Sequence, residues 1–303
     1  MTITDRPFRD PSDVARMKRL VVEGRAASPH SGYMHCGDVD WRLFGPHGFP
    51  LEEIVRLWED AGDLAGWALL SADGVDYQVH PSRRSSSLER SIIGWGQEQT
   101  LAWRLANRLA PNCVVECYVD DAERMALLEE MGYIRTDRGA VHFVRDLADA
   151  IDEPAIWDGW AVRGLRQESV ESRAAPQAEA FAPGSKTTPS TWRHMMANAA
   201  GYDPELDSIV AMPDGTIVSA ALAWLDTHNR VGEFEPVGTR PACWRMGFAR
   251  LAMLRGLRVM RERGMETAIV QTNATNAPAI GLYESVGFAI VNRSVEYEYV
   301  PDT

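Results

Sequence analysis

The chain has 303 residues, a length that suits two domains of about 150 residues, each able to bury its own core. Hydrophobic residues make up 45% and charged residues 24%, as in globular proteins, and no apolar run reaches the roughly 20 residues that a membrane-spanning helix needs. A formal net charge of -12 disfavours nucleic acid as a partner, because phosphate binding needs a basic surface. The negative charge would attract a cationic substrate, but it is equally well explained as a surface charge that only keeps the protein soluble.

The N-terminus lacks the basic start and apolar stretch of a secretory signal, which predicts a cytoplasmic protein. The four cysteines are Cys36, Cys113, Cys117 and Cys243. Their spacing matches neither a zinc site nor a redox pair, so they are interpreted as structural and no metal site is predicted.

Two segments about 155 residues apart share one order of elements: strand, helix, strand, helix, strand. In the first half these are expected over 76–81, 90–109, 113–118, 122–131 and 140–144. In the second half they are expected over 233–239, 248–263, 267–272, 277–286 and 293–300. The repeat predicts an internal duplication in which a final strand closes each half.

The join between the halves is acidic and contains Pro154, which is typical of a linker. We predict a degenerate N-terminal domain over 1–147, a linker over 148–158 and a C-terminal domain over 159–303. The second domain is expected to begin with a strand over 160–163. A hairpin, 208–212 and 216–225, should precede its later strands.

The turn from Pro241 to Ala249 joins a predicted strand to a predicted helix. The first N–H groups of a helix lack partners inside the helix, and the helix dipole adds positive charge, so main chain alone can hold a pyrophosphate. Gly247 and Ala249 leave room for close approach. Three arginines add positive charge around the turn: Arg240, Arg245 and Arg250.

A second motif follows the next predicted strand, with Asn276 as a good helix N-cap and Gly287 beyond the end of the helix. Tyr283 lies seven residues after Asn276 and therefore shares its helix face. The tyrosine either reaches a cleft or is a buried structural residue.

Together these elements resemble the GNAT superfamily of acyl-CoA-dependent N-acetyltransferases. The family's phosphate loop is Pro-x-x-(Arg/Gln)-x-x-Gly-x-(Gly/Ala), which Pro241, Gly247 and Ala249 match, whereas Trp244 stands at the Arg/Gln position. The later family motif, Asn-x-x-Ala-x-x-Leu-Tyr-x-x-x-Gly-Phe, is matched at every named position of 276–288. The two-domain layout is similar to tandem members such as the mycothiol synthase group.

The resemblance implies an α/β fold of two tandem domains, each a mixed, mostly antiparallel central sheet flanked by helices. It implies acetyl-CoA as co-substrate. In the family a main-chain N–H of the cofactor strand stabilises the oxyanion of the thioester, and a glycine there suits a bulge. The residues expected to hold acetyl-CoA are Val237, Gly238, Thr239, Trp244, Arg245, Met246, Gly247, Phe248, Ala249 and Asn276.

Two residues are expected to carry the chemistry. Tyr283 lies where the family places the acid that protonates the departing thiolate, and a phenol suits this because the two groups have comparable basicity. The attacking amine must be neutral, so a base is needed. Glu235 is the candidate, with Glu233 and His194 as alternatives.

The first half carries a degraded copy of both motifs. Aligned on Pro81, its loop has Arg84 at the Arg/Gln position but Ser87 and Glu89 where Gly and Gly or Ala are wanted, and a carboxylate there would repel a pyrophosphate. Three residues replace the Ala, Leu and Tyr of the later motif: Met125, Leu128 and Glu129. We expect one cofactor site, in the C-terminal half, and an N-terminal half that walls the acceptor cleft.

The predicted function is therefore acetyl transfer from acetyl-CoA to a small-molecule primary amine, directly within a ternary complex, by a monomer or homodimer. The alternative is a non-catalytic acyl-CoA-binding regulatory module that kept the cofactor loop and lost turnover. Tyr283 favours the enzyme. The identity of the acceptor does not follow from the fold.

Overall fold

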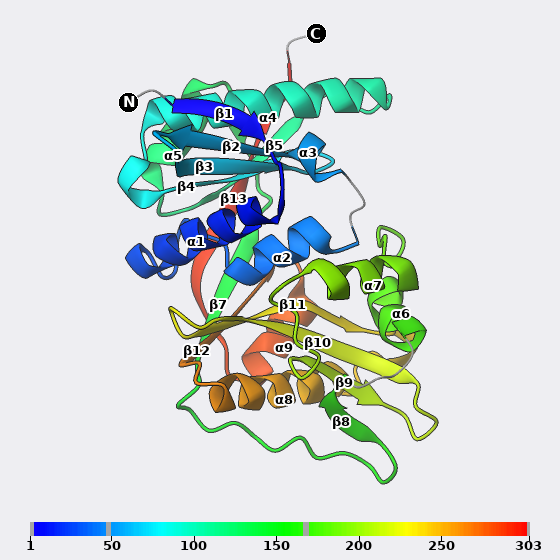
Figure 1. Cartoon of the computed structure of the whole chain (residues 1–303). Helices are drawn as coiled ribbons and strands as arrows, with labels where there is room; N and C mark the ends of the chain where they lie inside the picture. The colour runs from blue at the N-terminus through cyan, green and yellow to red at the C-terminus, as the bar shows by residue number, and fades with distance from the viewer. Residues whose placement is uncertain (1–2, 47–49, 166–169, 302–303) are drawn as a thin grey trace.

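The computed structural model of the chain describes residues 3–46, 50–165 and 170–301, and Figure 1 shows two halves stacked one above the other. Each half is a sheet with helices against its faces, and most strand pairs are antiparallel, which confirms the predicted fold class. No helix in the described part of the chain is both long and apolar enough to cross a membrane.

The elements of the first half, in chain order, are β1 (Ile3–Pro7), α1 (Pro11–Ala27), α2 (Cys36–Phe44), α3 (Leu51–Ile54), β2 (Val55–Asp60), β3 (Asp63–Leu70), β4 (Val75–Val79), α4 (Ser86–Ala106), β5 (Cys113–Tyr118), α5 (Ala122–Glu130), β6 (Ile134–Arg135) and β7 (Ala140–Asp146). Those of the second half are β8 (Ala161–Gly164), α6 (Val170–Ala180), α7 (Pro189–Asn198), β9 (Asp207–Ala211), β10 (Ile217–Asp226), β11 (Val231–Thr239), α8 (Phe248–Glu262), β12 (Thr267–Asn273), α9 (Ala277–Ser285) and β13 (Ala289–Tyr299). A short 3-10 turn follows β4 and another follows β11. The repeated order of elements is thus present in both halves.

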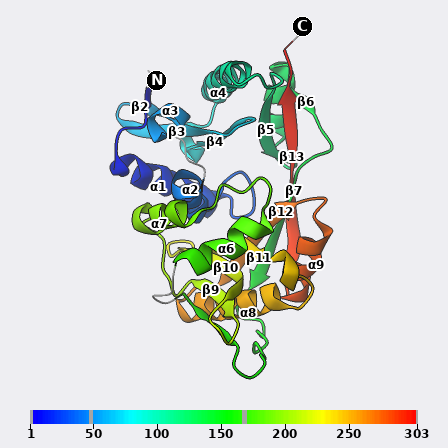
Figure 2. The same cartoon turned by 90° about the vertical axis from the view of Figure 1, so that its right-hand side faces the viewer.

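The last strand of each half lies in the sheet of the other half. β7 pairs with β12 from Ala140 to Asp146 and is inserted between β12 and the start of β13. The second part of β13, from Ser294 to Tyr299, pairs with β5 and with β6. Figure 2 shows β13 running from beside α9 up to β5 and β6. One long sheet, β5-β13-β7-β12-β11-β10-β9-β8, therefore spans both halves, and β1 to β4 form a separate sheet.

The prediction that each half is closed by its own last strand is wrong. The apolar alternation of a strand determines which of its faces is buried, but it does not determine which sheet the strand joins. The domain boundaries, 1–147 for the first domain, 148–158 for the linker and 159–303 for the second domain, remain a prediction. Whatever limits are chosen, the two folded units exchange a strand.

Helices of both halves pack together in the middle of the molecule. Trp41 of α2, Trp192 of α7 and Trp224 of β10 belong to one buried apolar cluster, and the rings of Trp41 and Trp192 meet edge to face at 5.9 Å. Arg173 of α6 lies over the Trp192 ring at 4.1 Å and forms a buried ion pair with Asp207. This packing holds α2 of the first half against β10 and β11 of the second.

The exchange predicts that the C-terminal strand stabilises the first half. Val295 is 5% exposed in the core of the first half, whereas Val291, four residues earlier in the same strand, is 46% exposed. We expect Val295→Ala to lower the free energy of unfolding by about 1–3 kcal/mol and to speed amide exchange in β5. Val291→Ala should change stability by less than about 0.5 kcal/mol. Urea denaturation and hydrogen exchange measure both, and unchanged exchange in β5 with Val295→Ala would contradict the prediction.

Candidate active site

β11 and β12 part halfway along β11. The two strands are parallel and in register only from Val231 to Glu233, where Glu233 lies opposite Ile269. On its other side β11 stays paired with β10 as far as Thr239. The second part of β11 therefore has a main-chain edge with no strand partner in the described structure, and an extended ligand can pair with such an edge.

A β-bulge marks the point where the strands part. Glu235 and Pro236 together stand opposite Leu222 of β10, and Pro236 explains the irregularity because proline has no N–H to donate to the ladder. The bulge predicted at Gly238 is therefore wrong in position. Gly238 is in regular register, and its role is close packing, since a Cβ there would lie 3.3 Å from the Ala180 side chain of α6.

Beyond the bulge, Val237 and Thr239 turn their main chain toward the gap. The Arg240 N–H donates to the Val218 carbonyl at 2.9 Å, which fixes the alternation of the β10–β11 ladder. By that alternation the N–H and C=O groups of Val237 and Thr239 face away from β10, whereas those of Gly238 face it. The two main-chain donors expected for an oxyanion are thus oriented into the gap.

The turn into α8 presents a row of N–H groups without partners. Arg245 and Gly247 have positive φ angles of 60° and 82°, a conformation that turns successive N–H groups toward one side. The first helical bond runs from the Leu251 N–H to the Gly247 carbonyl at 3.1 Å. For the N–H groups of 245–250, the described residues provide no acceptor. This is the geometry of an anion site at a helix N-terminus.

The side chains around the turn differ in what they can offer. Trp244, at the Arg/Gln position, is 59% exposed and its indole N–H donates to the Thr239 carbonyl at 2.8 Å. Met246 is also exposed, whereas Phe248 is buried against Trp160 and can contribute only its main chain. Ala249 is half-buried and adds no bulk.

Of the three arginines near the turn, two are already paired. Arg240 forms two contacts with Glu179, at 2.6 and 3.0 Å, and Arg250 pairs with Asp152 at 2.6 Å. Arg245 has no ion-pair partner among the described residues. Arg245 is therefore the side chain that can meet an anionic ligand directly.

α9 presents the two residues singled out in the second motif. Asn276 is the N-cap, as predicted: its amide oxygen accepts from the Ala279 N–H at 3.3 Å, and its side chain is exposed. The Tyr283 ring is 6% exposed and packs edge to face against Phe143 of β7, with centroids 5.5 Å apart. Arg145 of β7 donates to the carbonyl of Val286 at the other end of α9. The strand exchanged from the first half thus positions the tyrosine.

Tyr283 and Glu235 influence each other electrostatically. Burial, and then the negative charge of Glu235, raise the pKa of the Tyr283 phenol above its usual value. Burial raises the pKa of Glu235 to about 8, and repulsion by Asp38 and Glu233 adds to the shift. Glu235 is thus a carboxylic acid that ionises near neutral pH, and its charge acts on a phenol that stays protonated.

A cleft lies between the halves, beside Glu233. The second half supplies β12 and part of β11, and the first half supplies the exchanged strand β7, the segment before and within α2, and strands β4 and β5. Its charged and polar lining includes Arg25, His35, Asp38, Arg42, Asp76, Glu116, Tyr118, His142 and Glu233. The alternative base His194 is exposed on α7 and does not line this cleft.

Sequence reasoning missed the contribution of the first half to this cleft. Asp38 is 3% exposed, and burial together with the charge of Glu233 raises its pKa to about 7. It lies in the first turn of α2, where His35 is the N-cap and the Asp38 side chain accepts from the His35 N–H at 3.1 Å. That capping pattern indicates a helix start, but nothing in it indicates that the helix meets β11.

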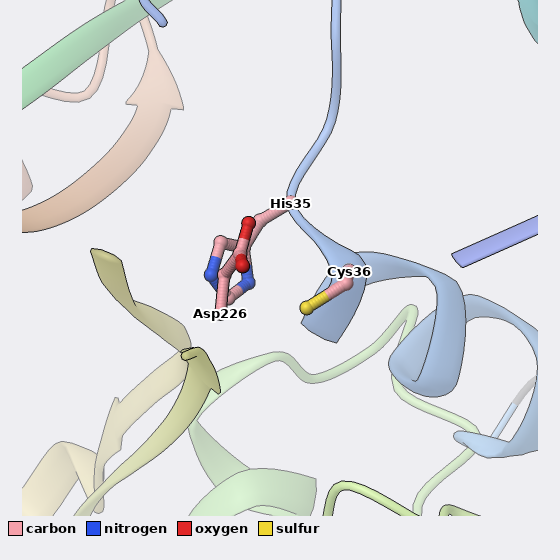
Figure 3. Close-up of side chains that lie close together, drawn as sticks. All are labelled: His35, Cys36 and Asp226. Carbon is pink, nitrogen blue, oxygen red and sulfur yellow. The ribbon is translucent and has the colours of Figure 1, made fainter. Parts of the chain in front are cut away.

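One group of side chains, His35, Cys36 and Asp226, is close enough to consider as a metal site, and Figure 3 shows it between α2 and the end of β10. Each member already has a partner in the protein. His35 Nε2 lies 3.2 Å from the Val231 carbonyl, Cys36 donates to the Leu225 carbonyl, and Asp226 accepts from Asn229. Burial raises the pKa of the Cys36 thiol to about 12, which disfavours the thiolate that a metal needs. We interpret the group as a junction between the halves.

The equivalent loop of the first half is shorter by two residues and is closed by its own side chains. Ser85, rather than Ser87, is the helix N-cap equivalent to Gly247, so the predicted alignment of Ser87 and Glu89 is wrong. The Ser85 hydroxyl accepts from the Leu88 N–H and satisfies a donor that an anion would need. An alignment of Pro81 with Pro241 that allows no gap cannot detect that the loop of the first half is two residues shorter.

Charged groups fill the space beside that loop. Glu89 is buried and accepts from the Tyr77 hydroxyl at 2.6 Å, from Arg84 at 2.7 Å and from Arg124 at 3.0 Å. Arg84 also binds Asp121 at 2.6 Å. The arginine that would meet a phosphate is therefore already neutralised within the protein.

The later motif of the first half also shifts by one residue. Asp121 and Asn276 are both N-caps, and Gly132 and Gly287 both have φ near 85° at the same spacing from them. Leu128 therefore stands at the position of Tyr283, one residue earlier than predicted. Neither alignment provides a phenol.

Residues 173–288 match the model of the acetyltransferase (GNAT) family. The chain is 25% identical to a mycothiol acetyltransferase of Salinispora arenicola over 98% of this chain and 96% of the relative. It is 28% identical to a mycothiol acetyltransferase of Thermomonospora curvata over 79% of this chain and 80% of the relative.

Two solved structures share the whole fold. A tandem GNAT protein from the clavulanic acid biosynthesis pathway matches with a TM-score of 0.71 and 16% identity, over the full length of both chains. A GCN5-related N-acetyltransferase from Sphaerobacter thermophilus matches with a TM-score of 0.64 and 23% identity, over 99% of this chain and 97% of the other. The unpaired edge of β11, the open turn before α8 and the tyrosine on α9 all lie within the matched segment, so the chain contains an acetyltransferase domain of the GNAT family within a tandem two-domain fold.

Proposed function

We propose that this protein transfers the acetyl group of acetyl-CoA to a primary amine of a small molecule, by direct attack within a ternary complex in the C-terminal half. The observation that carries the proposal is the presence of three features in one half of the chain. These are the N–H groups of 245–250, the edge of β11 beyond Glu235, and the Tyr283–Glu235 pair. The relatives named as mycothiol acetyltransferases support a small-molecule acceptor.

In the proposed complex the pyrophosphate accepts from the N–H groups that precede and begin α8, and Arg245 adds a positive charge. The pantetheine arm lies along β11 as an added strand and pairs with the main chain of Val237. The Thr239 carbonyl already accepts a hydrogen bond from the Trp244 indole. The N–H groups of Val237 and Thr239 face away from β10, so they are the donors available at this edge. One of these N–H groups stabilises the oxyanion that forms on the thioester carbonyl.

The chemical step needs one base and one acid. Glu235, as the carboxylate, accepts a proton from the acceptor ammonium, directly or through water, and the neutral amine attacks the thioester carbon. A C–N bond forms, the C–S bond breaks, and Tyr283 donates its proton to the departing thiolate. The second proton of the attacking nitrogen then passes, directly or through water, to the Tyr283 oxygen, which leaves the amide, the free thiol, a neutral tyrosine and a protonated Glu235. Burial and the charge of Glu235 raise the pKa of the Tyr283 phenol, which keeps this acid protonated until the thiolate departs.

The single-site prediction can be tested by calorimetric titration with acetyl-CoA. We expect one site per chain, and Gly247→Glu should weaken binding by about two orders of magnitude because it brings a carboxylate to the anion site and a side chain to a left-handed residue. Ser87→Glu, in the first turn of α4, is the matched control and should leave binding unchanged. Two sites, or binding that survives Gly247→Glu, would contradict the assignment.

Tyr283→Phe tests the proposed acid. The ring packing against Phe143 is kept, so the fold and the affinity for acetyl-CoA should be unchanged. We expect kcat to fall by about 100-fold or more, because a general acid contributes about that much. Thiol release from acetyl-CoA measures the rate. Full activity of Tyr283→Phe would remove the tyrosine from the mechanism, and acetyl-CoA binding without turnover by the wild type with any amine would favour a regulatory module.

The pH dependence tests the proposed base. With a pKa of about 8, roughly a tenth of Glu235 is ionised at pH 7, so kcat/KM should rise with pH and the rise due to this group should level off above about 8. Glu235→Gln should lower kcat/KM by about 100-fold and remove that inflection, leaving only the ionisation of the amine. An unchanged profile in Glu235→Gln would assign the inflection to another group.

A further inference from the structure

We propose that the cleft between the halves binds a second ammonium group of the acceptor beside Glu233 and Asp38, with Glu116 adding negative charge to the same cleft, so that the acceptor is an aliphatic diamine or polyamine. This inference rests on the proposed acetyl transfer, because it assumes that another amino group of the same molecule is acetylated beside Glu235.

The first argument is the charge that remains in the cleft after its internal ion pairs are counted. Four carboxylates line it, and one of them, Asp76, is paired with Arg42. Arg124 also lines the cleft but is paired with Glu89, which lies outside the lining. The uncompensated carboxylates are then Asp38, Glu116 and Glu233.

One arginine and the histidines do not balance this charge. Arg25 donates to the carbonyls of Tyr33 and Pro29, at 3.1 Å each, and forms no ion pair among the described residues. Burial lowers the pKa of His142 to about 4, so this ring is neutral near pH 7. Among the described residues, unpaired carboxylates therefore outnumber the unpaired arginine of the cleft by three to one. Burial raises the pKa values of Asp38 and Glu116, so part of their negative charge develops when a cation binds beside them, and the cleft favours a cation over a neutral or anionic acceptor.

The second, independent argument is a buried oxygen without a partner. Glu233 is 3% exposed, lines the cleft, and its Oε2 accepts no hydrogen bond within the described structure. The nearest polar atom is His35 Nδ1, at 3.2 Å, but that nitrogen itself accepts from the Gly37 N–H at 3.0 Å. Nε2 lies 3.2 Å from the Val231 carbonyl and therefore carries the ring proton. Two acceptors thus face each other, and an ammonium group supplies the missing donors.

The cleft also lies at a suitable distance from the reacting centre. Glu233 precedes the proposed base Glu235 by two residues, which spans about 6.5 Å along a strand. Phe143 lines the cleft and contacts the ring of Tyr283. A linear chain of four to six methylenes can therefore place one nitrogen beside Glu235 and the other near Glu233.

The test compares acceptors of equal length that differ in one terminal group. Acetylation of 1,5-diaminopentane, 5-amino-1-pentanol and pentylamine is measured at saturating acetyl-CoA with the full-length protein. We expect kcat/KM for the diamine to exceed that for the amino alcohol by about ten- to a hundredfold, the range for a hydrogen bond to a charged group. Glu233→Gln and Glu116→Gln should each move this ratio toward one. Glu98→Gln, an exposed carboxylate of α4, is the matched control and should leave the ratio unchanged.

Several results would overturn the proposal while the proposed function stands. One is a wild-type ratio near one. Another is a Glu233→Gln variant in which all three acceptors slow equally, since that result makes Glu233 a base rather than a binding residue. Glu116→Gln provides a second variant, in an exposed residue of β5 that lines the same cleft.

If no amine is acetylated, calorimetric titration of the acetyl-CoA-bound protein with 1,5-diaminopentane still decides the question. Binding that Glu233→Gln weakens about tenfold or more would support the ammonium site and overturn the proposed acetyl transfer. Absence of binding would overturn the ammonium site.

Discussion

The exchange of the last strands between the halves is the constraint on which the rest of the structure depends. β7 supplies both the Phe143 ring against which Tyr283 packs and the Arg145 side chain that binds the end of α9. β13 in return carries Val295 and Tyr297 into the core of the first half. Neither half can complete its sheet or its core without the other. The first half therefore forms a permanent wall of the cleft beside β11, and its position does not depend on a second chain.

The parting of β11 and β12 is the second constraint, and it arises locally. Pro236 interrupts the ladder, and the bulge changes which face each later residue occupies. Phe234 and Val237, three residues apart, both pack into the core beneath α8, which a regular strand with a repeat of two could not achieve. Glu233, before the bulge, points instead toward His35 of the first half. One irregularity thus gives the same strand a carboxylate that lines the cleft and a main-chain edge without a strand partner in the described structure.

Much of this arrangement could be predicted from local sequence. The strand before Pro241, the helix start at Gly247 and the N-cap Asn276 depend on residues within a few positions of one another, and capping and turn chemistry act at that range. The strand exchange could not be predicted, because the apolar pattern of β13 is the same in either sheet. The acidic lining contributed by α2 could not be predicted either, since Asp38 and Glu233 are almost 200 residues apart and meet only through packing of the Trp41, Trp192 and Trp224 cluster. The shifted alignment of the degenerate copy had a simpler cause, the loss of two residues from its loop.

The two copies of the fold differ most in which polar groups are left without partners. In the first half, Arg84, Arg124, Glu89 and Asp121 satisfy one another, and Ser85 caps the helix. In the described part of the second half, the corresponding N–H groups, the Arg245 guanidinium and Glu233 Oε2 have no such partners. A buried polar group without a partner costs about 1–3 kcal/mol, so leaving Glu233 in this state opposes folding. The first copy shows that this fold can close the same region with its own side chains. The open groups in the second copy are therefore not a requirement of the architecture, and their free energy is recovered only when a ligand supplies the missing charges and donors.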